Sequence, residues 1–373
     1  MHNWIIFLIE SEFRKLFERI EEVLLSAAKI GDLKPFISIV KCKAFDPNRL
    51  LTLRLPKSSS VECLLKRDKT YYLHIASEHG QKDVVEFLLQ NGAKVDEREE
   101  GNVSALMLAS ENGHEAVVDT LLEAGAEVNL TTEGKVRIAS GFGLDAGEGM
   151  VPMIQTVVGG FSALLYAAQA GHYKIVEKLL LRGAKVGQRS VTYEGEELNN
   201  KAKFEGSCSA IMFASILGRA DLVELLLSHG ASLNDKTIKD ISMDFTMEMF
   251  GLSKEPEHPI GLTCIMLAAK HGHENVVKLL LSKGASVKDQ DTHGNTALYY
   301  ALRNRHNSCI DLLLYFGSNP NIFAKQASPG RVTALHLAIG AFPNVMYQLL
   351  DQGADRTLSD HQRVPSLAEI ARY

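Results

Sequence analysis

The chain has 373 residues, of which 46% are hydrophobic and 23% are charged. This composition is typical of a folded, soluble protein and excludes a chain that is disordered throughout. The net charge of −5 gives the whole molecule no attraction to nucleic acid or to acidic membranes, so neither is expected as a partner.

The chain contains five cysteines, and no two of them are spaced as in a zinc or redox motif. An odd number also argues against a framework of disulfides, which favours a reducing compartment. We therefore expect an intracellular location, cytoplasmic rather than nuclear, and neither a metal nor a cofactor. The cysteines are Cys42, Cys63, Cys208, Cys264 and Cys309.

Residues 1–22 are predicted to form an N-terminal capping helix region. The six apolar residues Trp4 to Ile9 are too few for a signal peptide or a membrane span, so we expect no membrane insertion. Residues 23–48 contain alanines and a helix-ending Gly31, and they are interpreted as a divergent first copy of the repeat described next. Residues 49–69 form an inserted basic loop, for which a solvated loop is favoured over a docking patch.

Residues 70–358 repeat one unit seven times. Three copies are SALMLASENGHEAVVDTLLEAGAEVN from Ser104, SALLYAAQAGHYKIVEKLLLRGAKVG from Ser162 and TCIMLAAKHGHENVVKLLLSKGASVK from Thr263. A Ser or Thr starts six of the seven copies, where its hydroxyl can cap a helix by accepting a backbone N–H. A glycine then ends each of two short helices, because glycine adopts the left-handed conformation without steric cost. Arg305 replaces this glycine in the sixth copy, and we expect strain there.

The spacing of the second glycines locates three insertions. It is 33 residues between Gly92 and Gly125, but 58, 47 and 54 residues in the next three intervals. The added residues follow the second helix, near 130–160, 188–207 and 235–261. The first insertion contains four glycines between 141 and 149, but their spacing and context do not fit a nucleotide-binding loop.

This unit resembles the ankyrin repeat, since TALHLA at 333–338 and YLHIA at 72–76 are close to the signature of that family. The resemblance implies an all-α fold: a solenoid of helix pairs with short β-hairpin fingers, three of them enlarged. Residues 359–373 are interpreted as half a repeat that caps the C-terminus. His74 and His336 take the signature histidine position, where the resemblance implies bonds to backbone across repeats.

The resemblance also implies a concave groove lined by the two residues before the first glycine of each copy. These residues run from acidic through neutral and apolar to basic, which predicts an extended protein partner of opposite polarity. Six pairs are few, so a chance order of charges stays an alternative. The candidate groove residues are Glu78, His79, Glu111, Asn112, Gln169, Ala170, Ile216, Leu217, Lys270, His271, Arg303 and Asn304.

The third insertion contains SMDFTMEMFGL, whose apolar residues are candidate finger contacts for a partner. A patch that folds back onto neighbouring helices is an equally good interpretation. The candidate contacts are Met243, Phe245, Met247 and Phe250.

No nucleophile-elbow, Walker or kinase motif is present, and most histidines occupy repeated positions of the unit. We therefore expect no enzyme, but a monomeric scaffold or adaptor that mediates protein–protein interaction. One alternative is a regulatory ankyrin module of a larger enzyme, channel or receptor. A second is small-molecule or nucleic-acid binding by the fingers.

Overall fold

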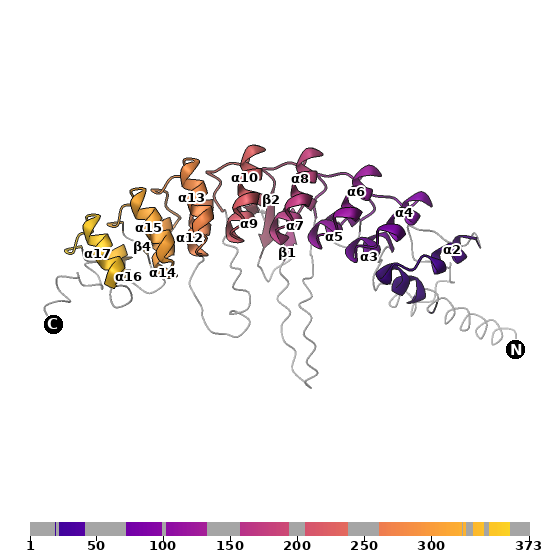
Figure 1. The fold of residues 1–373 in the computed structure, drawn as a ribbon, viewed down its shortest axis with the longest axis horizontal. Helices are drawn as coiled ribbons and strands as arrows, with labels where there is room; N and C mark the ends of the chain where they lie inside the picture. Colours follow the sequence, from indigo (N-terminus) through magenta and orange to yellow (C-terminus); the bar gives the residue numbers. More distant parts are fainter. Residues whose placement is uncertain are drawn as a thin grey trace, which may run out of the picture. The chain divides into compact units, whose positions relative to one another are not determined.

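The structure, a computed structural model, divides the chain into two compact units, Met1–Lys185 and Val186–Tyr373. Each unit is built from consecutive pairs of short helices (Figure 1). No helix in the described part of the chain is long and apolar enough to span a bilayer. The described residues are 19, 22–41, 72–98, 102–132, 157–193, 206–237, 261–322, 324–325, 331–338 and 343–358.

The first unit begins with a helical segment at 22–30, a left-handed turn at Gly31 and a second helix, α2. Three complete helix pairs and one short strand follow. The elements are α2 (Lys34–Lys41), α3 (Tyr72–Glu78), α4 (Lys82–Gln90), α5 (Ala105–Glu111), α6 (Glu115–Glu123), β1 (Val157–Gly159), α7 (Ala163–Ala170) and α8 (Tyr173–Leu181).

Helices of the first unit pack in two rows. The first helices of successive copies, α3, α5 and α7, contact one another in that order, and the second helices α4, α6 and α8 do the same. Alanines such as Ala76, Ala109 and Ala167 are fully buried where first helices meet, and their small side chains allow the helices to approach closely. Leu88 and Leu121 are fully buried from the second helices. Stacking therefore buries the apolar faces that a single pair leaves open.

The second unit has the same plan. Its first helices α9, α12, α14 and α16 contact in order, as do the second helices α10, α13, α15 and α17. Strands β2 and β3 pair antiparallel, as do β4 and β5. The elements are β2 (Arg189–Tyr193), β3 (Gly206–Ser209), α9 (Ala210–Ile216), α10 (Ala220–Ser228), α12 (Cys264–Lys270), α13 (Glu274–Ser282), α14 (Ala297–Arg303), α15 (Asn307–Tyr315), β4 (Ala324–Lys325), β5 (Arg331–Val332), α16 (Ala334–Ala338) and α17 (Pro343–Asp351). The predicted helical repeat architecture is confirmed.

The predicted hydroxyl caps form in only some copies. The hydroxyls of Ser104, Ser162 and Thr296 accept backbone N–H groups three residues later at 3.3–3.4 Å. Within the described residues, the buried hydroxyl of Ser209 has no hydrogen-bond partner. The expectation of a cap is thus wrong for this copy, where the extended backbone that starts the helix forms without the side-chain bond.

The first and third insertions are closed at their bases by the same set of bonds. The amide of Thr132 donates to the carbonyl of Phe161 at 2.9 Å, and its hydroxyl accepts the Phe161 N–H at 3.0 Å. Thr237 makes the same two bonds with Leu262, each at 2.9 Å. Gly160 and Gly261 take left-handed conformations and donate to the threonine carbonyls at 2.8 and 2.7 Å. We call each of these arrangements an insertion base.

The uninserted hairpin at 291–295 contains the equivalent bonds. The Asp291 amide donates to the carbonyl of Asn295 at 3.0 Å, and the Asp291 carboxylate accepts the Asn295 N–H at 2.9 Å. At the second insertion the Ser190 hydroxyl accepts the Cys208 N–H at 3.3 Å. In these four hairpins a buried side-chain oxygen seven residues after the second glycine therefore makes the closing bond, whether or not residues are inserted.

Several predictions fall on residues outside the described ranges. They are the N-terminal capping region through residue 18, the basic loop 49–69, the interiors of the three insertions with Met243, Phe245, Met247 and Phe250, and the C-terminal cap 359–373. The enlarged fingers, the domain boundaries and the finger contacts stay predictions.

Candidate functional site

The six predicted residue pairs all lie where a first helix ends. The first member of five pairs is the last helical residue, as Glu111 is in α5 and Lys270 in α12, while Gln169 and Ala170 are the last two residues of α7. We call these six sets the turn pairs. Their members are exposed, with two exceptions: Lys270 is half-buried and Ile216 is buried at 8% exposure. Leu217, at 38% exposure, therefore carries the accessible apolar surface of its pair.

A histidine of the next copy holds the backbone of four turn pairs in place. Each histidine directly precedes a second helix, and its Nε2 lies within hydrogen-bond distance of a turn-pair carbonyl. The bonds are His114 to Glu78 at 2.8 Å, His172 to Glu111 at 3.0 Å, His273 to Ile216 at 2.6 Å and His306 to Lys270 at 3.1 Å. We call them the histidine links. They fix the spacing between successive turn pairs within each unit.

The glycine after a turn pair makes the histidine link possible. Gly113 has a φ of +79°, and a Cβ at this position would lie 2.6 Å from Cε1 of His172. Glycine is thus required both by the left-handed backbone and by the close approach of the ring. Arg305 takes the corresponding position in the sixth copy with a φ of +63°, which confirms the predicted strain at that turn.

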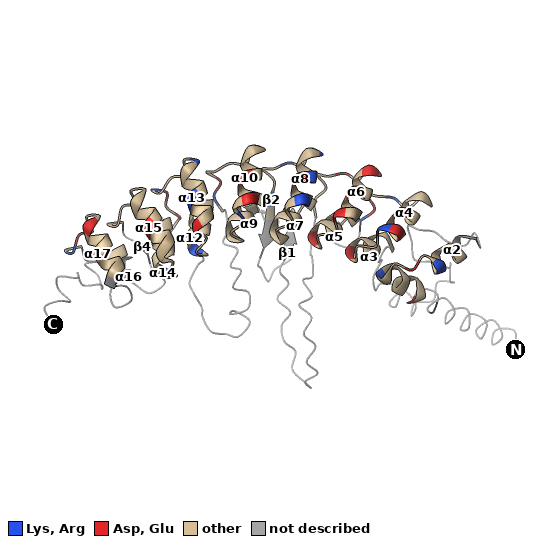
Figure 2. Cartoon of the chain, in the orientation of Figure 1, with Lys and Arg blue, Asp and Glu red and all other residues tan. Residues whose placement is uncertain are grey.

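The turn pairs of the first unit form an acidic surface. Glu111 is exposed at the surface but partly surrounded by protein, and this partial burial, with the nearby Glu78 carboxylate, raises the pKa of Glu111. Tyr166 lies in α7, one turn before Gln169 and Ala170. Burial and the Glu111 charge raise the pKa of Tyr166 to about 12. Figure 2 shows acidic residues at the ends of α3 and α5. A cation of a partner placed next to Glu111 would stabilise the charged form of this carboxylate.

The turn pairs of the second unit form an apolar and basic surface. Leu217 is followed in the next copies by Lys270 and by the exposed Arg303. Figure 2 shows the basic end of α12. The His271 ring stacks on that of His273, with 6.2 Å between centroids.

Some turn-pair side chains bond to their own helix. The Asn112 amide donates to the carbonyl of Leu108 at 2.9 Å, and the Asn304 amide to that of Tyr300 at 3.1 Å. The His79 ring contacts the carbonyl of Ile75 at 3.0 Å. Each of these carbonyls also accepts the backbone N–H of the same residue at 3.1 Å, so the side chain adds a second bond at the helix end, a structural role that the sequence argument did not assign.

The signature histidines differ between copies. Nε2 of His74 lies 3.2 Å from the carbonyl of Val103 in the next copy, as the resemblance implies. Nδ1 of His336 contacts Thr333 of its own copy, 2.7 Å from the hydroxyl oxygen. The cross-repeat bond is therefore shown for His74 and stays a prediction for His336.

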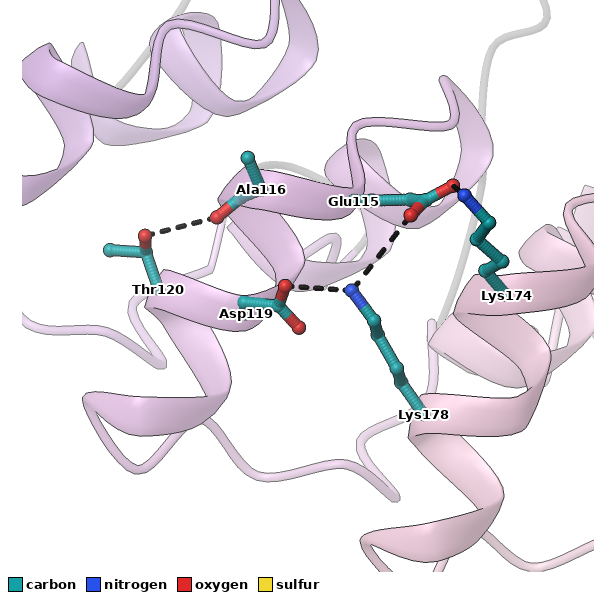
Figure 3. A network of polar contacts seen from close by, with 6 residues as sticks. All are labelled: Glu115, Ala116, Asp119, Thr120, Lys174 and Lys178. Carbon is teal, nitrogen blue, oxygen red and sulfur yellow. Dashed lines mark hydrogen bonds and ion pairs between the residues drawn. The ribbon is translucent and has the colours of Figure 1, made fainter.

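A separate polar network joins second helices of the first unit (Figure 3). Lys178 of α8 lies 2.7 Å from Asp119 and 3.9 Å from Glu115, both in α6, and Lys174 lies 3.5 Å from Glu115. All four side chains are at least 30% exposed, so solvent screening limits each pair to well under about 1 kcal/mol. The network joins the second helices of neighbouring copies and does not include any turn-pair residue.

The described residues contain no group of three or more His, Cys, Asp or Glu side chains placed to hold a metal ion. Cys208, Cys264 and Cys309 are buried free thiols. Burial raises the pKa of Cys264 to about 12 and that of Cys309 to about 11, which disfavours the reactive thiolate.

The sequence profile described as ankyrin repeats, three copies, matches residues 39–132, 155–240 and 244–324 of this chain. The chain belongs to the ankyrin repeat family. Ankyrin repeats generally act as protein–protein interaction modules and are generally non-catalytic.

Other ankyrin repeat proteins are similar over part of their length. An ankyrin repeat protein of fowlpox virus is 34% identical over 104 residues, which cover 27% of this chain and 29% of the viral protein. The ankyrin repeat and SOCS box protein 11 of Danio rerio is 38% identical over 104 residues, 27% of this chain and 33% of that protein. The match thus spans about a third or less of each relative.

A solved structure of the human ASB11 ankyrin repeat domain has a TM-score of 0.53 and 24% identity to this chain. The alignment covers 76% of this chain and 98% of the human domain. At this identity the likeness supports the fold and leaves the partner open.

Proposed function

We propose that this protein is a non-catalytic scaffold or adaptor that binds extended protein segments through its turn pairs. The observation that carries the proposal is the combination of fixed backbone and varied side chains. Histidine links hold the turn-pair carbonyls at 2.6–3.1 Å, while the exposed side chains change from copy to copy. A rigid surface loses little conformational entropy on binding, and its side chains set specificity.

Charge gives each unit its own preference. The first unit presents Glu78 and Glu111 and would favour a basic stretch of the partner. The second unit presents Lys270 and Arg303 and would favour an acidic stretch. Complementary charge of this kind chiefly sets orientation and association rate, and Leu217 offers apolar burial that adds affinity.

The test selects random peptides from a display library on the immobilised full chain. Dissociation constants of the synthesised peptides are then compared between wild type, Glu111→Lys and Lys270→Glu. We expect Glu111→Lys to weaken binding of basic peptides about tenfold, and Lys270→Glu to weaken binding of acidic peptides about tenfold. Lys278→Glu in α13 is the matched control, because Lys278 is exposed but lies outside the turn pairs. Failure to enrich any peptide, or unchanged affinity in both variants, would refute the proposal.

A second candidate function is a regulatory module within a larger protein. The observation that favours it is the match to a SOCS box protein, of which the similar segment covers only 33%. Sequencing transcripts that encode this chain tests the idea: an added domain in the same reading frame supports it, and transcripts limited to the repeats contradict it.

A further inference from the structure

Three successive turns of the second unit are tied into one row. His273 joins its own turn to Ile216 at 2.6 Å, and His306 joins its turn to Lys270 at 3.1 Å. The residues that flank these links are Leu217, Lys270, His271, Arg303 and Arg305. We call these five residues the basic row. Their backbone spacing is set by the links before any partner arrives.

Arg305 stands where the preceding copies of this unit have glycine. Gly218 and Gly272 take φ values of +72° and +76°, and Arg305 takes +63° at the corresponding turn. A side chain in this conformation is strained, whereas glycine would accept it without steric cost. Arg305 is exposed, so an arginine at this turn adds an accessible positive charge two residues after Arg303.

Leu217 lies next to an ion pair of its own copy. Arg219 points its guanidinium at Asp221 through two bonds of 2.9 and 2.7 Å, so both charges are compensated locally. Leu217 thus adjoins a neutral pair at one end and Lys270 at the other. Ile216 is buried beside it, which leaves Leu217 as the apolar contact of this end.

We infer that the basic row binds an acidic peptide segment whose apolar residue contacts Leu217 while its carboxylates contact Lys270, Arg303 and Arg305. This inference rests on the proposed function and specifies the partner chemistry for the second unit. A protein segment is favoured over nucleic acid because the row has three permanent cations, a leucine adjoins them, and the net charge of the chain is −5. Nucleic-acid binding depends on more phosphate contacts and on a basic domain.

The inference is tested with a short fluorescein-labelled peptide that carries one leucine followed by a run of glutamates. A sister peptide has glutamine in place of every glutamate, and a third probe is single-stranded DNA of similar length. Fluorescence anisotropy with the full chain measures all three. We expect the glutamate peptide to bind about tenfold or more tightly than the glutamine peptide, and to bind less tightly at high salt.

Variants locate the bound peptide on the row. We expect Arg305→Gly to weaken binding about three- to fivefold and Lys270→Glu to weaken it about tenfold. Arg305→Lys keeps the charge and retains most of the affinity, and Lys278→Glu serves as the control outside the row. A further peptide keeps the glutamates but lacks the leucine. Leu217→Ser should weaken binding of the leucine-containing glutamate peptide more than it weakens binding of this shortened peptide.

Thermal unfolding separates recognition from folding. Because glycine relieves the strained turn, Arg305→Gly should raise Tm by about 2–4 °C while it weakens binding. Equal binding of the two peptides, preference for the DNA probe, or affinity that is insensitive to both Arg305→Gly and Lys270→Glu would overturn the inference. If the display library yields binding peptides while the glutamate peptide fails, the proposed function stands and the inference alone is refuted. If neither binds, both are refuted.

Discussion

Two requirements of the fold meet at Gly113, the left-handed backbone and the ring of His172. Gly113→Ala would place a methyl group 2.6 Å from the ring at a φ of +79°. We expect a loss of about 2–4 kcal/mol in unfolding free energy, measured by urea denaturation. Gly125→Ala is the control, because its φ is +88° and no atom lies within 4 Å of the added methyl group. It should lose only about 1–2 kcal/mol. Equal losses would show that the histidine link adds nothing.

His74 couples the stability of the first unit to pH. Burial lowers its pKa from 6.5 to about 4, and this effect outweighs the bond to the Val103 carbonyl, which raises the pKa. Between pH 6.5 and 4 the unfolded chain binds a proton that the folded chain does not, so stability falls as pH falls through this window. We expect His74 to contribute about 3 kcal/mol of this loss.

The measurement for His74 is urea unfolding of wild type and His74→Gln at several pH values. The variant should lose less stability than wild type between pH 6.5 and 4. His79→Gln removes an exposed histidine just after the opposite end of the same helix, α3, and should retain the wild-type slope. Parallel curves for wild type and His74→Gln would contradict the argument.

At the scale of elements, the first insertion base joins the helix pair before Thr132 to the helix pair after Gly160. Thr132 is 1% exposed, and its hydroxyl accepts the N–H of Phe161. Thr132→Val keeps the shape and removes the acceptor, which should cost about 1–3 kcal/mol. The amide of Phe161 should also exchange faster with solvent deuterium, as measured by NMR. Thr132→Ser keeps the hydroxyl and should keep most of the protection. Unchanged exchange in Thr132→Val would mean that the base is held by other bonds.

Sequence periodicity predicted the helix pairs, because the glycines and alanines of the unit report backbone conformation and close packing directly. It also predicted the strained turn at Arg305. It did not predict which caps form, since the Ser209 hydroxyl remains unbonded although its backbone matches that of the capped copies. Nor did it predict that Ile216 is buried while Leu217 is exposed, because burial at a helix end depends on the neighbouring copy. The bonds of Asn112 and Asn304 to their own helices are likewise visible only in three dimensions.

At the scale of the whole molecule, alkylation of the three buried thiols can measure the order in which parts of the second unit unfold. Cys208 and Cys264 are 1% exposed and Cys309 is fully buried, so alkylation requires local or global unfolding. Repeat arrays are held by contacts between neighbours and open where those contacts are weakest. Cys309 lies in α15, between the strained turn at Arg305 and the five-residue helix α16. Cys208 precedes the regular pair α9 and α10.

We therefore expect Cys309 to be alkylated before Cys264 and Cys208 in mild urea. Pulsed alkylation followed by peptide mass spectrometry resolves the three sites and separates them from Cys42 and Cys63. Arg305→Gly should slow labelling of Cys309 more than that of Cys208, since it relieves strain next to α15 alone. Simultaneous labelling of all three would show that the second unit opens as one cooperative body, and earlier labelling of Cys208 would place its weakest contacts at the opposite end.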